Sequence, residues 1–219
     1  LLRYMENKIR TFKAVLTKIR YIGYVSKHPF DGFWDLKHEK KGSMRIALSL
    51  YIVMGVISVI QRNASAYVFN TTDPRYVNIV TDFIIVVLPF LLFVVSNWCL
   101  TTLMDGKGTL PDVFRYVGYS LLPLIISNIL VLILSYALSR DEAMVLSVIS
   151  GIGVIWTLYL IFSGTVATHD YSAGKTIVTL GLSIAGMVFI VFVSMIFINI
   201  MEQVVDFGVM IYEDISIRQ

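Results

Sequence analysis

Residues 97–127 read NWCLTTLMDGKGTLPDVFRYVGYSLLPLIIS, which is the end of one apolar run, a short polar turn and the start of the next apolar run. Aspartate and glycine in the turn DGKG, residues 105–108, favour a tight reversal of the chain. Thr109 with Asp112 three residues later is typical of a helix N-terminus, and the proline between them fits the first helical turn. The stretch therefore predicts two antiparallel helices, and Pro123 predicts a bend in the second of them.

The composition places this hairpin in a membrane. Hydrophobic residues make up 57% of the 219 positions and charged residues only 15%, and the mean hydropathy is +0.76. A soluble domain carries about 25% charged residues. A helix needs roughly 20 apolar residues to cross the hydrocarbon core. The sequence predicts an all-α polytopic membrane protein with five transmembrane helices, at about 44–61, 79–104, 113–138, 144–168 and 175–201.

The distribution of Lys and Arg predicts the orientation of the five spans. Residues 1–45 hold eleven of the eighteen, and Lys107, Arg115 and Lys175 follow the second and fourth spans. Only four basic residues fall on the opposite side. Because positive residues in short loops stay in the cytoplasm, we expect the N-terminus inside and the C-terminus outside.

Four parts are expected along the chain: a basic amphipathic arm at 1–27, an interfacial helix at 28–43, the five-helix domain at 44–201 and an acidic outer tail at 202–219. In the arm, an apolar residue recurs every three or four positions from Met5 to Ile19. This stripe is compatible with a helix lying on the inner leaflet or with one docked in a partner's groove.

The lead-in HPFDGFWDLKHEKKGS, residues 28–43, concentrates potential ligands just before the first span. On a helical wheel one face holds Asp31, Asp35, His38 and Glu39, and the opposite face holds Phe30, Phe33, Trp34, Lys37 and Lys41. An aromatic face with lysines is typical of a helix in the membrane interface. No third element completes a tetrahedral zinc site. We expect no metal, and we take Asp31, Trp34 and Asp35 as candidate partner-binding residues.

The sequence contains no motif that indicates an enzyme or a nucleic-acid-binding protein. AGKT at 173–176 resembles the end of a phosphate-binding loop but has His169 where the first glycine is required, and Lys175 instead marks a membrane boundary. HExxH, GxSxG and GxGxxG are absent from the sequence. His169 and Asp170 read as an exposed pair at the end of the fourth span. We expect no catalytic residue, no cofactor and no nucleic-acid partner.

Two amides are expected inside the membrane, Asn97 in the second span and Asn128 in the third. Such amides commonly hydrogen-bond between helices, and the small residues Gly164 and Gly181 suggest close helix packing nearby. The alternative is a transport pathway between spans two, three and four, lined by Asn97, Tyr119 and Asn128. The middles of the spans contain no charged residue or histidine, which disfavours ion-coupled transport.

The third span carries Gly118, Tyr119 and Pro123 as a GYxxxP pattern, following the turn that contains Asp105 and Gly106. This combination resembles the Yip domain family, five-span membrane proteins whose eukaryotic members act in Golgi and endoplasmic reticulum traffic and associate with Rab GTPases. The turn and the 28–43 lead-in look like its bacterial branch. The resemblance covers about residues 28–201 and implies the same five-span fold with the N-terminus inside.

The lead-in departs from the trafficking members, because DGFWDLKHEKKG stands where they have a DLYGP-type motif. Rab binding is therefore not carried over. Some bacterial relatives are encoded beside carbohydrate-type ABC permeases. The resemblance implies a non-catalytic scaffold or accessory subunit in the bacterial plasma membrane, with the lipid bilayer and ABC permeases as partners. The alternatives are a small-molecule or lipid transporter, and a trafficking adaptor of the Golgi or endoplasmic reticulum membrane.

Overall fold

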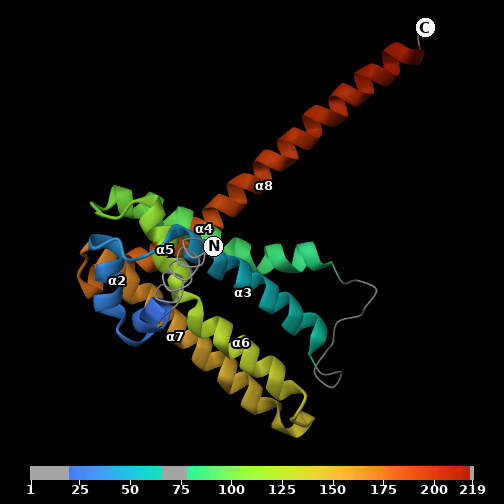
Figure 1. The fold of residues 1–219 in the computed structure, drawn as a ribbon. Coiled ribbons are helices and arrows are strands. Elements are labelled where there is room, and N and C mark those ends of the chain that lie inside the picture. The colour runs from blue at the N-terminus through green and yellow to red at the C-terminus, as the bar shows by residue number, and fades with distance from the viewer. Residues whose placement is uncertain (1–19, 66–77, 218–219) are drawn as a thin grey trace, which may run out of the picture.

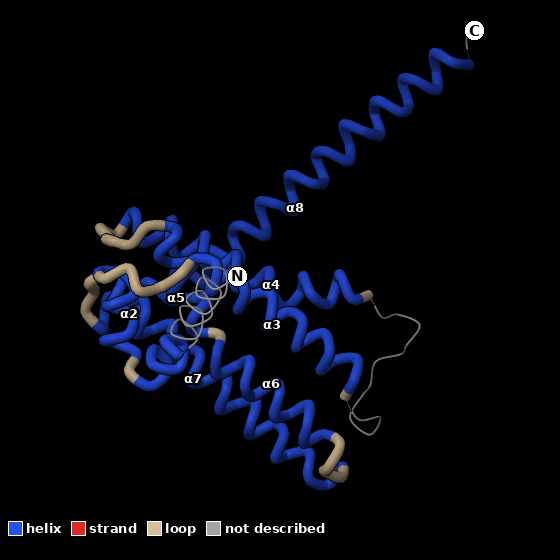
Figure 2. Tube along the Cα trace, viewed as in Figure 1, coloured by secondary structure: helices blue, strands red, loops and turns tan. Residues whose placement is uncertain are grey.

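All regular elements in the described part of the chain are helices (Figure 2). The computed structural model describes residues 20–65 and 78–217, and residues 20–27 form a helical lead-in. The elements that follow are α2 (Pro29–His38), α3 (Met44–Ala64), α4 (Ile79–Leu103), α5 (Leu110–Ser120), α6 (Leu122–Ser135), the 3₁₀ turn η2 (Arg140–Glu142), α7 (Ala143–His169) and α8 (Ala173–Ile217). The apolar stripe expected from Met5 to Ile19 lies outside the described residues.

Five helical stretches are long and apolar enough to cross a membrane, which confirms the fold expected from the sequence. They are Met44–Ala64, Ile79–Leu103, Leu110–Ser135, Arg140–His169 and Ala173–Ile211. Successive spans reverse direction (Figure 1). The start of α3, the α4–α5 turn and the α7–α8 turn therefore gather at one end of the molecule, with α2 beside them. We call residues 39–43, 104–109 and 170–172 the loop end.

The third span is divided at Leu121. α5 ends at Ser120, and α6 begins at Leu122 with Pro123 in its first turn. The Ser120 hydroxyl donates to the carbonyl of Tyr116 (2.8 Å) and not to that of Tyr119. The bend expected from Pro123 thus takes the form of a break between two helices.

Small residues bring the spans together, though not all of those expected from the sequence. A Cβ at Gly164 would lie 2.7 Å from the Tyr116 ring, so close packing there is confirmed. The expectation for Gly181 is wrong, since a Cβ there would meet nothing within 4 Å. α8 turns Ser183 and Gly186 towards α4 instead, and Gly186 packs against the Ser96 hydroxyl.

The last helix leaves the bundle. The first part of α8 packs against α4, and the rest extends alone (Figure 1). In the most apolar stretch of each of the other four spans, 28–44% of the residues are buried in the protein, whereas in the most apolar stretch of α8 none are. Thr176, Thr179 and Ser183 at the start of α8 are buried, so it is the part of the helix beyond them that is left to lipid or to another molecule.

Candidate functional site

The loop end is built around the α4–α5 turn. Asp105 adopts a left-handed conformation (φ 58°), and the Gly106 N–H donates to the carbonyl of Thr101 (2.7 Å), closing the end of α4. Asp112 then accepts hydrogen bonds from the Thr109 N–H (3.0 Å) and hydroxyl (2.6 Å) at the start of α5. The tight turn and the cap expected from the sequence are both confirmed.

The two glycines of this turn enclose a histidine from α7. His169 is only 1% exposed, and its Nδ1 accepts a hydrogen bond from the Gly108 N–H (3.3 Å). A Cβ at Gly106 would lie 2.6 Å from Nδ1, and a Cβ at Gly108 would lie 2.6 Å from Cε1. The glycines are therefore required for the close approach of the turn to the imidazole.

The interpretation of His169 and Asp170 as an exposed pair is wrong for His169, which is buried, whereas Asp170 is exposed as expected. Asp170 adopts a left-handed conformation (φ 54°) and binds Lys107 of the turn (3.0 Å), while the histidine ring is buried beside it. The Lys107 ammonium holds the pKa of Asp170 below its usual value. Both residues join the α4–α5 turn to the end of α7. In the described part of the chain, His169 Nε2 has no hydrogen-bond partner.

The start of α8 completes the loop end from the other side. The Tyr171 hydroxyl donates to the carbonyl of Met104 (2.9 Å), and the Lys175 ammonium donates to the same oxygen (2.6 Å). The ammonium also lies 4.2 Å from the centre of the Tyr171 ring. Lys175 therefore neutralises the negative end of α4, which has no basic residue in its own last turn.

α2 packs on this assembly with a face different from the one expected. Phe33 and Leu36 are fully buried, Phe33 meets the Tyr116 ring edge-on, and the Lys37 ammonium donates to the carbonyl of Thr168. The assignment of Phe33 and Lys37 to a membrane-facing surface is therefore wrong. Phe30 and Trp34, 46% and 49% exposed, remain on the outside.

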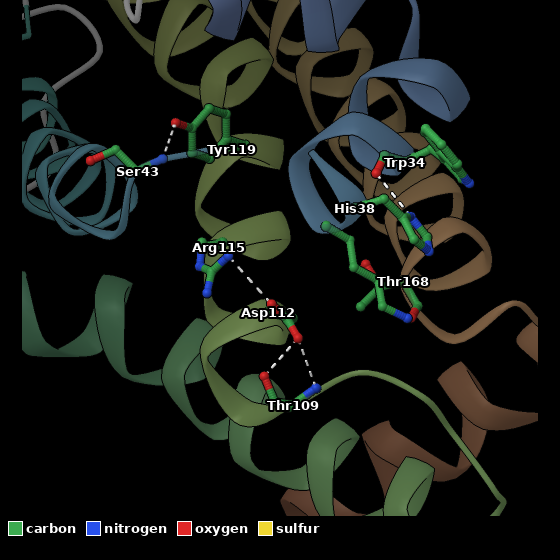
Figure 3. Close-up of polar contacts among 9 residues, drawn as sticks. Trp34, His38, Ser43, Thr109, Asp112, Arg115, Tyr119 and Thr168 are labelled. Carbon is green, nitrogen blue, oxygen red and sulfur yellow. Dashed lines mark hydrogen bonds and ion pairs between the residues drawn. The ribbon is translucent and has the colours of Figure 1, made fainter. Parts of the chain in front are cut away.

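The candidate partner-binding residues of α2 lie on its open side. Asp31 is exposed, and Trp34 stacks on His38 with 4.5 Å between ring centres (Figure 3). Asp35 is bound by Lys41 (2.8 Å), which also contacts Glu39, so the acidic and basic faces of the wheel meet. The hydrogen bonds that the Lys41 ammonium donates to Asp35 and Glu39 raise its pKa.

The GYxxxP residues join α5 to the start of α3. A Cβ at Gly118 would lie 3.0 Å from the Cβ of Ala47, so the two helices touch there. The Tyr119 hydroxyl accepts a hydrogen bond from the Ser43 N–H (3.1 Å; Figure 3). Pro123 makes the break described above. The three residues thus fix where the first and third spans cross.

Asn97 links four helices in the interior. Its amide donates to the Ser183 hydroxyl (3.0 Å) and its oxygen accepts from the Tyr116 hydroxyl (2.9 Å), which lies 3.2 Å from the Thr165 hydroxyl. Asn128 instead donates to Ser58 of α3 (3.3 Å). The polar side chains expected to line one pathway therefore point into separate helix contacts.

The chain matches a known protein family. The Yip1 domain matches residues 23–196, most of the chain. The protein belongs to the Yip1 domain family. Comparison with curated proteins and with solved structures gives no match.

The Yip1 domain covers the helical lead-in, α2 and the bundle, and it ends within α8. The last twenty-one residues of α8, 197–217, lie beyond it. Over the described residues, no group of three His, Cys, Asp and Glu side chains is arranged to hold a metal ion. The loop end of this Yip1 domain is thus a set of mutually bonded turns with an exposed α2 edge.

Proposed function

We propose that this Yip1 domain protein is a non-catalytic integral membrane scaffold or accessory subunit that binds another membrane protein through the distal part of α8. Yip1 domain proteins are not known as enzymes. The observation that carries the proposal is the row of exposed apolar side chains at the far end of this helix. Val204, Phe207 and Met210 are each about 60% exposed or more.

The length of α8 makes these side chains unusual. At 1.5 Å per residue, the 45 residues of α8 are about 68 Å long, whereas the hydrocarbon core is about 30 Å thick, so the helix extends beyond it. A moderate tilt does not remove the difference. Apolar side chains beyond the hydrocarbon are the composition expected of a protein contact.

The charges of this segment suggest what the partner presents. Glu202 and Asp206 are exposed and lie one turn apart, and the sequence has no Lys or Arg between Thr176 and Ile217. A partner helix with apolar and basic side chains would complement the segment. An ABC-type permease for carbohydrates fits the expected bacterial plasma membrane, with the N-terminus inside and the distal part of α8 outside.

The alternatives have less support. A transporter with a pathway between spans two, three and four would require Asn97 and Asn128 to line one cavity, and their contacts are separate. A trafficking adaptor of the Golgi or endoplasmic reticulum rests on the family alone. Its contact residues would be Asp31, Trp34 and Asp35, of which the first two are exposed.

The proposal is tested by placing a photoreactive amino acid at Phe207 in the full chain, in native membranes. We expect one discrete protein adduct, recovered with the chain in mild detergent. The same residue at Ile155, 70% exposed on α7, is the control and should give lipid adducts. A chain that elutes alone, with lipid adducts at both positions, would contradict the proposal.

A variant pair separates binding from folding. Phe207→Ser with Met210→Ser should abolish recovery of the partner without lowering thermal stability, because this part of α8 does not pack on the bundle. Ile155→Ser with Leu158→Ser, a pair of matched spacing and exposure, should leave recovery unchanged. Loss of the partner from both pairs would indicate a general defect instead.

The orientation is tested separately with single cysteines in a Cys99→Ser background. Asp141→Cys should react with a membrane-impermeant maleimide on intact cells, and Lys40→Cys should react only after permeabilisation. The reverse pattern would refute the N-inside, C-outside orientation.

A further inference from the structure

A cavity of about 330 Å³ lies between α6 and α7. Its walls include Ile126 and Leu130 of α6 and Ile152 and Trp156 of α7, all of which are partly exposed. The cavity therefore opens on the side of the bundle that faces lipid, and it lies away from the distal part of α8. None of the candidate residues Asn97, Tyr119 or Asn128 lines it.

The shape of the cavity follows from the sequence. Pro123 lines it at the break between α5 and α6. Deeper in, the absence of a side chain at Gly153 lets the Ser127 hydroxyl lie directly against α7 and form the floor. The Ser127 hydroxyl donates to the carbonyl of Leu124 (3.0 Å), so the floor offers no free donor to a ligand. An apolar occupant suits these surroundings.

The mouth of the cavity has a different character. Ser26 of the helical lead-in lines it, and the adjacent Lys27 is exposed. Tyr24 is 41% exposed and packs on His28, with 5.2 Å between ring centres. Basic and aromatic side chains are the usual composition at the level of lipid headgroups. The cavity thus has Ser26 at one end, next in the chain to an exposed lysine and close to an exposed tyrosine, and an apolar interior.

We infer that this cavity holds one acyl chain of an anionic membrane lipid, with the lipid headgroup beside Ser26 and Lys27. The volume is at the lower end of the range for ligand pockets, about 300–1,000 Å³. A partner helix about 10 Å across cannot enter it and could only lie over it. The positive charge at the mouth selects an anionic headgroup, because the basic side chain gains from a nearby negative lipid.

The test uses the full chain in lipid nanodiscs of phosphatidylcholine. The probe is phosphatidylglycerol or phosphatidylcholine with a diazirine on one acyl chain, and cross-linked peptides are mapped by mass spectrometry. We expect adducts to concentrate on the α6 and α7 peptides that line the cavity, and phosphatidylglycerol to give the higher yield there. Equal yields on these peptides and on α8, or equal yields from the two lipids, would overturn the inference.

Two kinds of variant make the test specific. Leu130→Trp fills the cavity and should remove most of the adducts there, whereas Leu158→Trp on another face of α7 should not. Ile152→Trp repeats the first result if Leu130→Trp does not fold. Unchanged adducts in a folded, filled variant would refute the inference.

The headgroup contact has its own variant. Lys27→Gln should lower the preference for phosphatidylglycerol about fivefold, since one basic side chain near an anionic surface contributes about 1 kcal/mol. Lys40→Gln, exposed between α2 and α3, should preserve the preference. An unchanged preference for phosphatidylglycerol in Lys27→Gln would contradict the placement of the headgroup beside Lys27. Cross-linking of the cavity to protein in native membranes would contradict a lipid occupant.

Discussion

Replacing Gly108 with alanine is expected to strain the loop end, because the new methyl group has no room. The Cβ would lie 2.6 Å from Cε1 of His169 and 2.7 Å from Cγ2 of Thr168. The ring cannot easily move away, since it stacks on Tyr171 with 5.4 Å between ring centres and lies against Gly106 on another side. Overpacking of this kind costs about 1–3 kcal/mol.

A second substitution separates this clash from a general effect of alanine. His169→Ala alone removes the ring and leaves the Gly108 N–H without its acceptor, at a cost of about 1–3 kcal/mol. In the double variant Gly108→Ala/His169→Ala the methyl group enters the space that the ring has left, and only its close contact with Thr168 remains. The double variant should therefore be more stable than the sum of the single changes predicts, by about 1–2 kcal/mol.

The measurement is the free energy of unfolding of the full chain in one mixed-micelle system, for all four members of the cycle. Gly181→Ala is the control, since a Cβ there meets nothing within 4 Å, and it should gain about 0.5–1 kcal/mol of helix stability. If Gly108→Ala were as stable as the parent, or if the two changes were additive, the packing of the turn around His169 would be refuted.

Three further outcomes are expected. Asn97→Leu should lower the unfolding free energy by about 1–3 kcal/mol, since two hydrogen bonds are lost. Asn128→Leu should lower it by about 1 kcal/mol or less. Equal decreases in melting temperature for the two variants in one detergent would contradict this. Asp82→Asn should cost about 1 kcal/mol, because the buried carboxylate binds Arg62 (2.9 Å), whose other side faces solvent, and unchanged stability would refute the pairing. Lys107 lowers the pKa of Asp170, so the pair stabilises the fold above the usual carboxyl pKa, and this stability is lost as the pH falls through the lowered pKa. When thermal stability is measured against pH, the parent should show a small decrease in acid that is absent from Asp170→Asn. The same decrease in the variant would assign it to another group.

The sequence predicts the spans well because their signal is local. Each span is one apolar run of sufficient length, and the cap at Thr109 and the break at Pro123 depend only on neighbouring residues. Hydropathy, turn chemistry and the geometry of proline act within one or two turns of the chain. The position of these elements could therefore be read from the sequence.

The buried face of α2 does not follow from side-chain type. The wheel grouped Phe33 with Phe30 and Trp34, although Pro29, Gly32, Phe33 and Leu36 recur at the spacing of one helix face and are all buried. Gly32 was the available signal, since a Cβ there would lie 2.8 Å from the backbone of Val25. A wheel gives the angles between side chains but not the side on which the bundle lies.

The burial of His169 does not follow from the sequence for a different reason. Its hydrogen-bond partner Gly108 is 61 residues away in the sequence, so no local pattern connects them. A histidine at the end of a span usually marks the interface, and only packing distinguishes a buried ring from an exposed one. The paired glycines of the turn were a sign that something must approach closely, but they did not say what.

The lysines of the loop end have two roles that should not be confused. Lys37 donates to the last turn of α7 and Lys175 to the carbonyl that follows α4, so each places a cation at the negative end of a span. The same residues enter the charge count that predicts the orientation. Removing them would destabilise the bundle as well as weaken the orientation signal, and a change in topology could not then be assigned to either cause. Lys27 and Lys40 are exposed and, unlike Lys37 and Lys175, donate no hydrogen bond to these helix ends, so substituting them changes the charge on that side without removing those bonds.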